Sequence, residues 1–247
     1  MSGRSALLLG ATGAVGKKLL AELLASNEWN KIGEFGRSVT APENMPPGQR
    51  DSRLEQKVID FENLDAAGLK DGRWDVVFVT LGTTRAQAGS AERFEKIDRE
   101  YVVDACRAAK SDDPAHEQRV VYLSSAGANA SSPFLYAKSK GLTELALARL
   151  GYSETIVFRP GLLKGAERAD KRLGETVFGY VTGALSHVSP NFEIQVPMLA
   201  KAIMNAGLLG SSRLPAEVGA KKAGVEGASF TLIDNKGSVL LSRAQET

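Results

Sequence analysis

Residues 5–20 read Ser5-Ala6-Leu7-Leu8-Leu9-Gly10-Ala11-Thr12-Gly13-Ala14-Val15-Gly16-Lys17-Lys18-Leu19-Leu20. This pattern is typical of a short apolar strand, a glycine turn and the start of a helix. Gly10 lets the chain turn sharply, Gly13 lets the backbone approach a pyrophosphate, and Gly16 lets the helix pack close to the sheet. The helix N-terminus then points its N–H groups at the phosphates. The stretch predicts a dinucleotide site, with an ordinary glycine turn as the alternative; its residues are Gly10, Thr12, Gly13, Ala14, Val15 and Gly16.

The composition indicates a soluble protein large enough to bury a substantial core, with 247 residues, 43% of them hydrophobic and 24% charged. A net charge of +2 gives no strong attraction to nucleic acid. The single cysteine, Cys106, excludes an internal disulfide, and its place in an apolar helical pattern favours packing over a reactive thiol. His116 and His187 lie far apart in the sequence, so we expect no metal site.

Strand and helix patterns alternate along the chain. Strands are predicted at residues 31–35, 56–59, 74–81, 119–123, 155–158 and 229–234, helices at 15–24, 92–110, 134–150 and 197–209, and a proline-rich loop at 42–53. This alternation predicts an α/β fold: a Rossmann-type, doubly wound parallel sheet in one NAD(P)-binding domain. Residues 1–160 would form the cofactor-binding core, and residues 161–247 a small C-terminal substrate lobe with the last strand.

The end of the second strand reads Glu34-Phe35-Gly36-Arg37-Ser38. A site for NAD needs an acid at the strand tip to hold the ribose 2′-OH. Arg37 follows the tip here and suits a 2′-phosphate, whereas Glu34 lies two residues before Gly36, inside the strand. The sequence therefore favours NADP(H) over NAD. The alternative for Arg37 is a solvated loop cation.

Two further strand ends carry polar residues. Asp60, followed by Phe61, ends the third strand, where its carboxylate could accept a hydrogen bond from adenine or simply cap the next helix. After the fourth strand, the backbone at Gly82 could pass close to a cofactor and the threonines could contact it. Arg85 is either a contact for a substrate anion or a surface charge. The predicted cofactor contacts of this loop are Leu81, Gly82, Thr83 and Thr84.

The fifth strand ends at Ser124-Ser125, and Tyr136 and Lys140 follow it at the start of a helix. Residues four apart share one face of a helix. A phenol has a pKa near 10, and a neighbouring ammonium group favours its ionised form. The pattern predicts acid–base chemistry at Tyr136 beside Lys140. A serine hydroxyl would bind a substrate oxygen, with Ser125 expected in that role and Ser124 as the alternative.

These motifs resemble the short-chain dehydrogenase/reductase superfamily over about residues 6–206: the glycine turn, Ser124-Ser125, Tyr136-x-x-x-Lys140 and Arg159-Pro160-Gly161. Residues 81–85, 98–102 and 134–136 look more specifically like an atypical subgroup, the animal Tat-interacting-protein-like oxidoreductases and their fungal relatives at the mitochondrial outer membrane. The resemblance implies a Rossmann fold, NADP(H), and catalytic roles for Ser125, Tyr136 and Lys140. Expected cofactor contacts here are Tyr136, Pro160 and Lys140, with Lys140 holding the nicotinamide ribose. The resemblance also implies that the protein is located on the cytoplasmic side of membranes, attached peripherally to the mitochondrial outer membrane.

Two functions remain open on the sequence. The first is an NADP(H)-dependent reductase or dehydrogenase of a small carbonyl or alcohol, acting as a monomer or homodimer without nucleic acid. The second is a regulatory or scaffold protein that binds NADPH and turns over little. A sugar-nucleotide epimerase is a weaker third, because the C-terminal part is short for such a substrate. Residues 162–209 would line the substrate pocket. No apolar run reaches the ~20 residues of a membrane span. Because the first strand begins so early, we expect no cleavable presequence.

Overall fold

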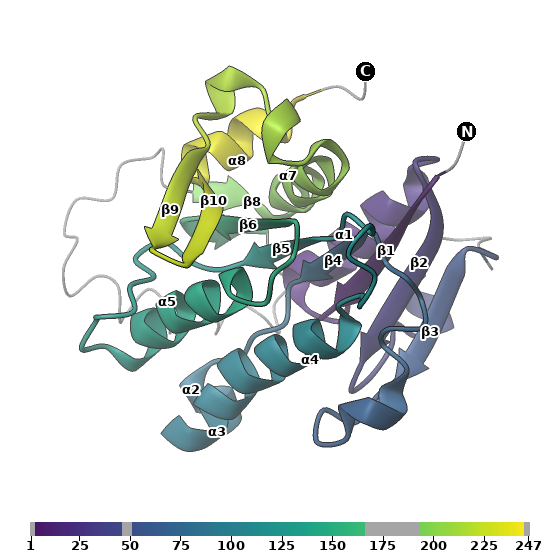
Figure 1. Ribbon diagram of the computed structural model, residues 1–247, viewed down its shortest axis with the longest axis horizontal. Coiled ribbons are helices and arrows are strands. Elements are labelled where there is room, and N and C mark those ends of the chain that lie inside the picture. Colours follow the sequence, from purple (N-terminus) through teal and green to yellow (C-terminus); the bar gives the residue numbers. More distant parts are fainter. Residues whose placement is uncertain (1–2, 46–50, 166–192, 245–247) are drawn as a thin grey trace.

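The computed structural model describes residues 3–45, 51–165 and 193–244. Its centre is an eight-stranded sheet in the order β3-β2-β1-β4-β5-β6-β10-β9 (Figure 1). Its strands are parallel except β9, which pairs antiparallel with β10. The strands are β1 (Arg4–Leu9), β2 (Trp29–Gly36), β3 (Leu54–Val58), β4 (Val76–Val79), β5 (Arg119–Leu123), β6 (Glu154–Arg159), β9 (Lys221–Val225) and β10 (Ala228–Asp234). A separate parallel pair joins β7 (Leu162–Lys164) to β8 (Glu193–Gln195).

Helices cover both faces of the sheet. Helices α1 (Ala14–Ala25), α7 (Val196–Leu209) and α8 (Asn235–Leu241) share one core cluster, while α4 (Tyr101–Ala109) and α5 (Leu135–Ala148) lie on the other face (Figure 1). This arrangement confirms the predicted doubly wound α/β class. The short elements are α2 (Arg85–Ala88), α3 (Ala91–Glu95) and the 3₁₀ turns Pro42–Asn44, Leu64–Ala67, Ser211–Arg213 and Ala216–Val218. No helix in the described part of the chain is both long and apolar enough to cross a membrane.

The apolar run of β1 explains why this strand lies at the centre. Successive strand residues point to opposite faces, so Leu7 and Leu9 join the core beneath α4, whereas Leu8 joins the core beneath α1. All of these side chains are fully buried. Residues 6–9 of this strand are apolar at every position and leave no side for water, as expected for a parallel sheet covered on both faces.

The turn from β1 into α1 depends on two glycines. Gly10 has φ +98°, a conformation that only glycine adopts readily, and a Cβ there would lie 2.5 Å from the backbone nitrogen of Leu81. A Cβ on Gly16 would lie 2.0 Å from the carbonyl oxygen of Gly10. Both contacts are impossible for a real Cβ, so these glycines permit the close approach of strand and helix.

The long helix predicted at residues 92–110 is interrupted. Helix α3 passes into a π-helical turn, η3 (Lys96–Glu100), which then continues as α4. A π-turn inserts extra chain into the helix and is frequently found at functional sites. Here the turn places Asp98 inside the protein, with none of its surface exposed.

Residues 193–244 contribute to the main layers of the molecule. The predicted helix at residues 197–209 is α7, which packs against α1, and the predicted last strand is β10, which lies beside β6. The antiparallel strand β9 and helix α8 were not predicted. The expected substrate-pocket stretch, residues 162–209, falls largely outside the described residues, which resume at Glu193.

Candidate functional site

The predicted site residues lie where parallel strands end. Gly10 follows β1, Arg37 follows β2 and Pro160 follows β6. The carboxyl ends of parallel strands share one edge of the sheet, and ligands of open α/β sheets bind there. The structure therefore brings the predicted cofactor and catalytic residues to the same edge.

The glycine turn leaves space at one of its three glycines. Gly13 is exposed at the N-cap of α1, and a Cβ built on it would touch only the Gly10 carbonyl oxygen, at 3.5 Å. Thr12 beside it is exposed, Ala14 is half-buried, and Val15 is packed in the core at 4% exposure. Open backbone at a helix N-terminus fits a pyrophosphate, and Val15 could contribute only its N–H group.

The acid in β2 is engaged inside the protein. One carboxylate oxygen of Glu34 accepts hydrogen bonds from the backbone nitrogen and hydroxyl of Thr40, at 2.6 and 2.7 Å. Its other oxygen accepts from Nε2 of Gln56 at 2.7 Å. Glu34 is only 1% exposed, whereas Arg37 is exposed just beyond the strand. The cation, and not the acid, is thus presented at the tip of β2.

Residues after β3 form an aromatic and charged wall. Phe61 stacks on Tyr101 of α4, with ring centroids 5.1 Å apart. The Asp60 carboxylate accepts a hydrogen bond from the backbone nitrogen of Glu62 at 2.9 Å, which closes a local turn; the next helical turn, Leu64–Ala67, has Asn63 at its N-cap and no side-chain cap, so Asp60 does not cap it. The Glu62 side chain pairs with Lys96 at 2.6 Å. Asp60 is exposed and Phe61 is buried, so the two predicted contacts differ in what they can offer a ligand.

The loop after β4 contains one exposed backbone position and one hydroxyl that is already hydrogen-bonded within the protein. Gly82 is exposed, with Leu81 and Thr83 half-buried on either side. Thr84 is buried at 6% exposure, and its hydroxyl accepts a hydrogen bond from Gln87 to cap α2. The backbone around Gly82 is therefore open to a ligand, whereas the Thr84 hydroxyl serves the local fold.

The two serines after β5 have different neighbours. Ser124 is buried and its hydroxyl donates to Glu144 at 2.6 Å, and Glu144 also holds Arg159 through a bidentate ion pair. Ser125 is only half-buried and lies close enough to Tyr136 for a hydrogen bond that lowers the pKa of its phenol. The Ser124 hydroxyl is thus tied to a structural ion pair, while Ser125 lies beside the phenol.

The loop that carries Ser125 is fixed to its neighbours through the backbone. The nitrogen of Ala126 donates to the carbonyl oxygen of Pro160 at 2.9 Å, and the nitrogen of Asn129 donates to that of Ala137 at 2.9 Å. Gly141 allows this second contact, because a Cβ there would lie 2.2 Å from the nitrogen of Ala130. These contacts set the distance between the serine loop and the helix that carries Tyr136.

Lys140 lies in a buried polar cluster. Its Nζ is 3.0 Å from Oδ1 of Asp98 and donates a hydrogen bond to the hydroxyl of Tyr122 at 3.1 Å. The same Nζ lies 5.9 Å from the ring centre of Tyr136, which is half-buried. Lys140 is 4% exposed, and Tyr122 and Asp98 are fully buried. The lysine therefore acts on Tyr136 by its charge.

The ionisation of this cluster follows from burial and the ion pair. Burial raises the pKa of the Tyr136 phenol, and Asp98 adds to the increase, while the charge of Lys140 and the hydrogen bond with Ser125 oppose it. The net result is a pKa above the ordinary value. Burial alone would lower the pKa of Lys140, but the Asp98 carboxylate holds it well above its usual range. At neutral pH, Tyr136 is a protonated phenol beside a permanent cation.

Sequence reasoning missed Asp98 and Tyr122. The signal for Asp98 was present, because residue 98 falls on the same helical face as Phe94, Tyr101 and Ala105. An acid on an apolar stripe needs a buried partner. Nothing in the strand pattern distinguishes Tyr122 from an ordinary core aromatic.

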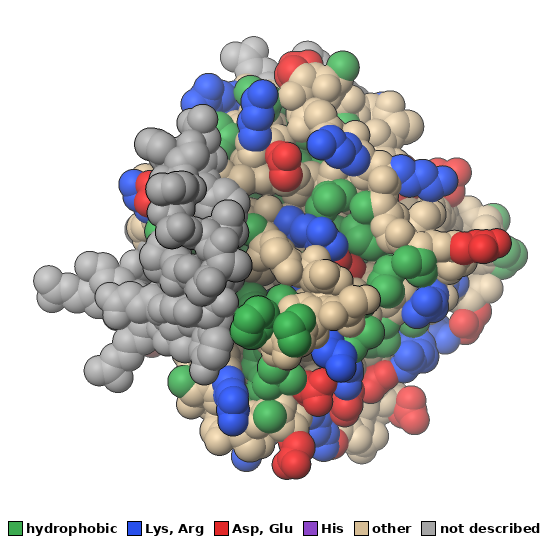
Figure 2. Space-filling model, turned by 90° about the vertical axis from the view of Figure 1, so that its left-hand side faces the viewer, with side chains coloured by type: hydrophobic (Ala, Val, Ile, Leu, Met, Phe, Trp, Pro, Cys, Tyr) green, Lys and Arg blue, Asp and Glu red, His purple; other side chains and the backbone are tan. Residues whose placement is uncertain are grey.

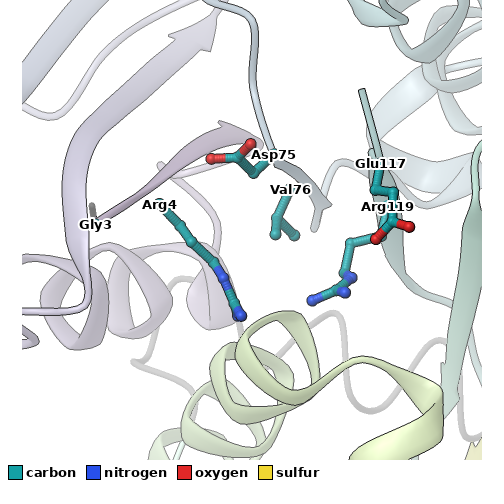
Figure 3. Close-up of a pocket in the computed structure, with 6 residues that line it drawn as sticks. All are labelled: Gly3, Arg4, Asp75, Val76, Glu117 and Arg119. Carbon is teal, nitrogen blue, oxygen red and sulfur yellow. The ribbon is translucent and has the colours of Figure 1, made fainter. Parts of the chain in front are cut away.

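A cavity of about 250 Å³ lies at the opposite edge of the sheet, where β1, β4 and β5 begin. In Figure 3, Arg4 and Arg119 point from its walls toward α7. Arg119 donates to the carbonyl oxygen of Gly207 at 2.6 Å, and Arg4 donates to that of Leu208. These cations cap the C-terminus of α7. The cavity is therefore separate from the candidate site.

Figure 2 shows the face that lies on the left in Figure 1, where the N-terminal end of α5 is found. Apolar side chains are exposed near its centre, and basic and acidic side chains intermingle along its lower margin. Phe134, immediately before α5, is 57% exposed. Exposed apolar surface beside α5 suits an uncharged part of a ligand.

Relatives of known name cover most of the chain. The rat (Rattus norvegicus) protein HTATIP2 is 35% identical over 206 residues, which is 83% of this chain and 81% of the relative. The mitochondrial protein FMP52-1 of the yeast Scheffersomyces stipitis is 36% identical over 172 residues, 68% of this chain and 71% of its own. These relatives are the animal and fungal groups that the sequence resembles.

Solved structures share the fold at low identity. The nucleoside-diphosphate-sugar epimerase of Agrobacterium tumefaciens gives a TM-score of 0.61 at 17% identity, over 98% of this chain and 81% of that one. The enzyme WbmF of Bordetella bronchiseptica, solved with NAD⁺, gives 0.58 at 14% identity, over 85% and 71%. A family model described as the NAD dependent epimerase/dehydratase family matches residues 6–188. The chain therefore belongs to the NAD dependent epimerase/dehydratase family, as an atypical short-chain dehydrogenase/reductase related to HTATIP2 and FMP52.

Proposed function

We propose that the protein is an NADP(H)-dependent oxidoreductase that reduces a small carbonyl compound to an alcohol. One observation carries the proposal: a half-buried phenol, Tyr136, lies beside Ser125 and has the Nζ of Lys140 5.9 Å from its ring centre, at the sheet edge that also presents the glycine turn. A proton donor, a hydroxyl donor and a dinucleotide cradle are the parts that carbonyl reduction requires.

The proposed mechanism divides the reaction between the cofactor and three side chains. The glycine turn at Gly10 and Gly13 would hold the dinucleotide, which when bound would supply the hydride for the carbonyl carbon. Ser125 donates a hydrogen bond to the carbonyl oxygen, and Tyr136 gives its proton to that oxygen as the alcohol forms. Tyr136 becomes a phenolate in this step. The positive charge of Lys140, whose Nζ is 5.9 Å from the centre of the Tyr136 ring, stabilises that phenolate. Because the pKa of Tyr136 lies above its ordinary value, the phenol holds its proton at neutral pH, which suits reduction.

The preference for NADP(H) rests on Arg37 and Glu34. The carboxylate of Glu34 is occupied by Thr40 and Gln56, so it is not available to a ribose hydroxyl. The exposed guanidinium of Arg37 offers paired donors to a 2′-phosphate. The same region would bind the adenosine half through Asp60, Phe61 and the loop at residues 81–84.

Residues 161–247 would supply the substrate lobe, and the protein would attach peripherally to the mitochondrial outer membrane. Support for the location comes from the fungal relatives, which are named mitochondrial. Fractionation of cells that express the chain tests the location. Release by alkaline carbonate from a mitochondrial fraction is expected, and recovery only in the fraction without membranes would contradict it.

The experiment that tests the function begins with the cofactor bound to the purified protein, identified by mass spectrometry after denaturation. NADPH oxidation is then followed against a panel of aldehydes and ketones. We expect NADP(H) in the protein and oxidation with at least one carbonyl. Tight NADPH binding without oxidation across the panel would favour a regulatory NADPH-binding protein, and no binding of either dinucleotide would overturn the proposal.

A further inference from the structure

Asp98 forms the most deeply buried ion pair among the described residues. Its carboxylate is 0% exposed and lies 3.0 Å from Nζ of Lys140, whose side chain is 5% exposed. The same carboxylate is 3.4 Å from the backbone nitrogen of Thr83 and from the hydroxyl of Ser139. A carboxylate without water is costly unless its partners satisfy it. An apolar side chain at this position would avoid the free-energy cost of removing a charge from water, yet the protein has an acid there.

Two local features of the backbone accommodate the Asp98 side chain. Asp98 lies in the middle of η3, the π-turn that interrupts the α3–α4 helix. The loop after β4 also accommodates it, because a Cβ on Gly82 would lie 3.2 Å from Oδ1 of Asp98 and 3.5 Å from Nζ of Lys140. The exposed backbone of Gly82 thus lies directly over the ion pair, between the pair and the surface.

The ammonium group of Lys140 has three N–H donors. Among the described residues, Asp98 and Tyr122 account for two of them. Both partners approach from elements other than α5: Asp98 from η3 and Tyr122 from β5. One donor is left for a ligand hydroxyl, and the direction of the group is fixed by the other two.

We propose that Asp98 is a positioning residue of the candidate active site, which holds Lys140 as a permanent, oriented cation beneath Gly82. This inference rests on the proposed function for its catalytic meaning. Within the described ranges of the chain, the groups that face Lys140 are Asp98 from η3, Tyr122 from β5 and Tyr136 from its own helix. Asp98 is the one carboxylate among them, so it alone can balance the lysine's charge at neutral pH.

The first test measures the protonation of Lys140 directly. The ε-carbon resonance of Lys140 is followed against pH in protein with isotope-labelled lysine, and is assigned by its loss in Lys140→Met. We expect Asp98→Asn to lower the midpoint by more than about one pH unit, a tenfold loss of proton affinity. An unchanged midpoint in Asp98→Asn would overturn the proposal.

Glu144→Gln is the matched control. Glu144 is also a buried carboxylate on α5, 1% exposed on its side chain, and it forms an ion pair with Arg159 at the end of β6. Its loss disturbs packing and charge to a similar degree without touching the lysine. The Lys140 midpoint is expected to stay at its wild-type value in this variant, and an equal fall in both variants would show a non-specific effect and sink the proposal.

The cofactor provides a second readout. In Asp98→Asn, NADPH affinity measured by calorimetry is expected to fall as the pH rises through the new Lys140 midpoint, while the wild-type affinity stays level over that range. A level profile in Asp98→Asn would contradict the positioning role. If wild-type protein binds no dinucleotide, the proposed function fails, yet the Lys140 titration still decides whether Asp98 holds the cation.

A variant set covers the case in which Asp98→Asn does not fold. Lys140→Met leaves the Asp98 carboxylate buried without its cation. Asp98→Asn/Lys140→Met removes both charges and is expected to unfold at a higher urea concentration than Lys140→Met alone. Equal or lower stability of the double variant would show that the two charges are not coupled.

Discussion

At the scale of single residues, the phenol of Tyr136 differs from the other buried tyrosines in its surroundings. The hydroxyl of Tyr122 is bound by Lys140, and that of Tyr152 donates to the carbonyl oxygen of Cys106 at 2.6 Å. Tyr136 is half-buried beside Ser125, where a ligand can reach it. Reactivity here depends on access as well as on charge.

Replacing Tyr136 with phenylalanine removes only this oxygen. We expect carbonyl-dependent NADPH oxidation to fall by roughly 10²–10⁴-fold, the usual size of a general acid–base contribution. Cofactor affinity is expected to change little, because the ring remains to pack against Phe94. Tyr152→Phe is the control, since it also removes one tyrosine hydroxyl but lies away from the site. Wild-type turnover in Tyr136→Phe would show that the proton comes from another group.

Arg37 determines the second prediction at this scale. Arg37→Ala is expected to weaken NADP(H) binding by about tenfold, the lower end for hydrogen bonds to a charged group at an exposed position. NAD(H) binding has no such contact to lose and is expected to stay the same. Calorimetric titration of both dinucleotides checks the difference, with Arg107→Ala, an exposed arginine paired to Asp104 on α4, as control. Equal losses for both dinucleotides would contradict the assignment.

How far the sequence predicts the site depends on whether a residue acts locally. Tyr136 and Lys140 are four apart on one helix, so their proximity is fixed by helical geometry alone. The choice between Ser124 and Ser125 was not decidable, because it depends on Glu144, a residue of α5 that reaches Ser124 only in the folded protein. The same holds for Tyr122, whose partner lies on another element.

At the scale of elements, the turn from β1 into α1 separates two roles of glycine. Gly13→Val is expected to fold as the wild type does, because a Cβ there meets nothing closer than 3.5 Å, yet its side chain would occupy the pyrophosphate position. Gly16→Ala drives a Cβ to 2.0 Å from the Gly10 carbonyl oxygen. We expect a cost of about 2 kcal/mol, or roughly 4–8 °C in Tm.

Thermal unfolding and calorimetric titration of the two variants check this contrast. Gly13→Val should no longer bind the cofactor, while its Tm stays at the wild-type value. Gly16→Ala should unfold at a lower Tm than the wild type. Normal cofactor binding by Gly13→Val would mean that the turn does not face the pyrophosphate. A wild-type Tm for Gly16→Ala would mean that strand and helix are not packed as closely as described.

Elements with strong periodicity were predicted, and elements set by tertiary contacts were not. Apolar strands such as β4 and β5, and helices α1 and α5, appear where the pattern indicated, with boundaries moved by a few residues. The π-turn η3 has no pattern of its own, because helical periodicity continues through it. Strand β9 is mostly exposed and contains Gly224, so it lacks the alternation of a half-buried strand and exists by pairing with β10.

At the scale of the whole molecule, buried groups that ionise only in alkali link stability to pH. Burial raises the pKa of the Cys106 thiol above its ordinary value of 9.0, and burial also raises the pKa of Tyr122 and of Tyr152 above 10.0. The unfolded chain then loses protons at a pH where the folded chain keeps them. These groups therefore contribute their whole share to the free energy of unfolding below about pH 9, and this share falls as the pH rises further.

We expect Cys106 to account for the first part of this fall. Between pH 9 and 10, the thiol contributes up to about 1.4 kcal/mol per pH unit, since it ionises only in the unfolded chain. Cys106→Ala should therefore show a shallower slope over this range in urea unfolding at a series of pH values, whatever its stability at neutral pH. Identical slopes for the two proteins would exclude the thiol as the cause.

The packing of α7 on α1 has a consequence for how the chain is made. Leu19, Leu20 and Leu23 of α1 share one buried cluster with Ile203 of α7, and most of the sequence separates the two helices. A ribosome adds roughly 5–20 residues each second, so α1 emerges many seconds before its cover. Until then the side of α1 that α7 covers is open to water or to a chaperone. This apolar side of α1 therefore stays uncovered while the chain between the two helices is synthesised.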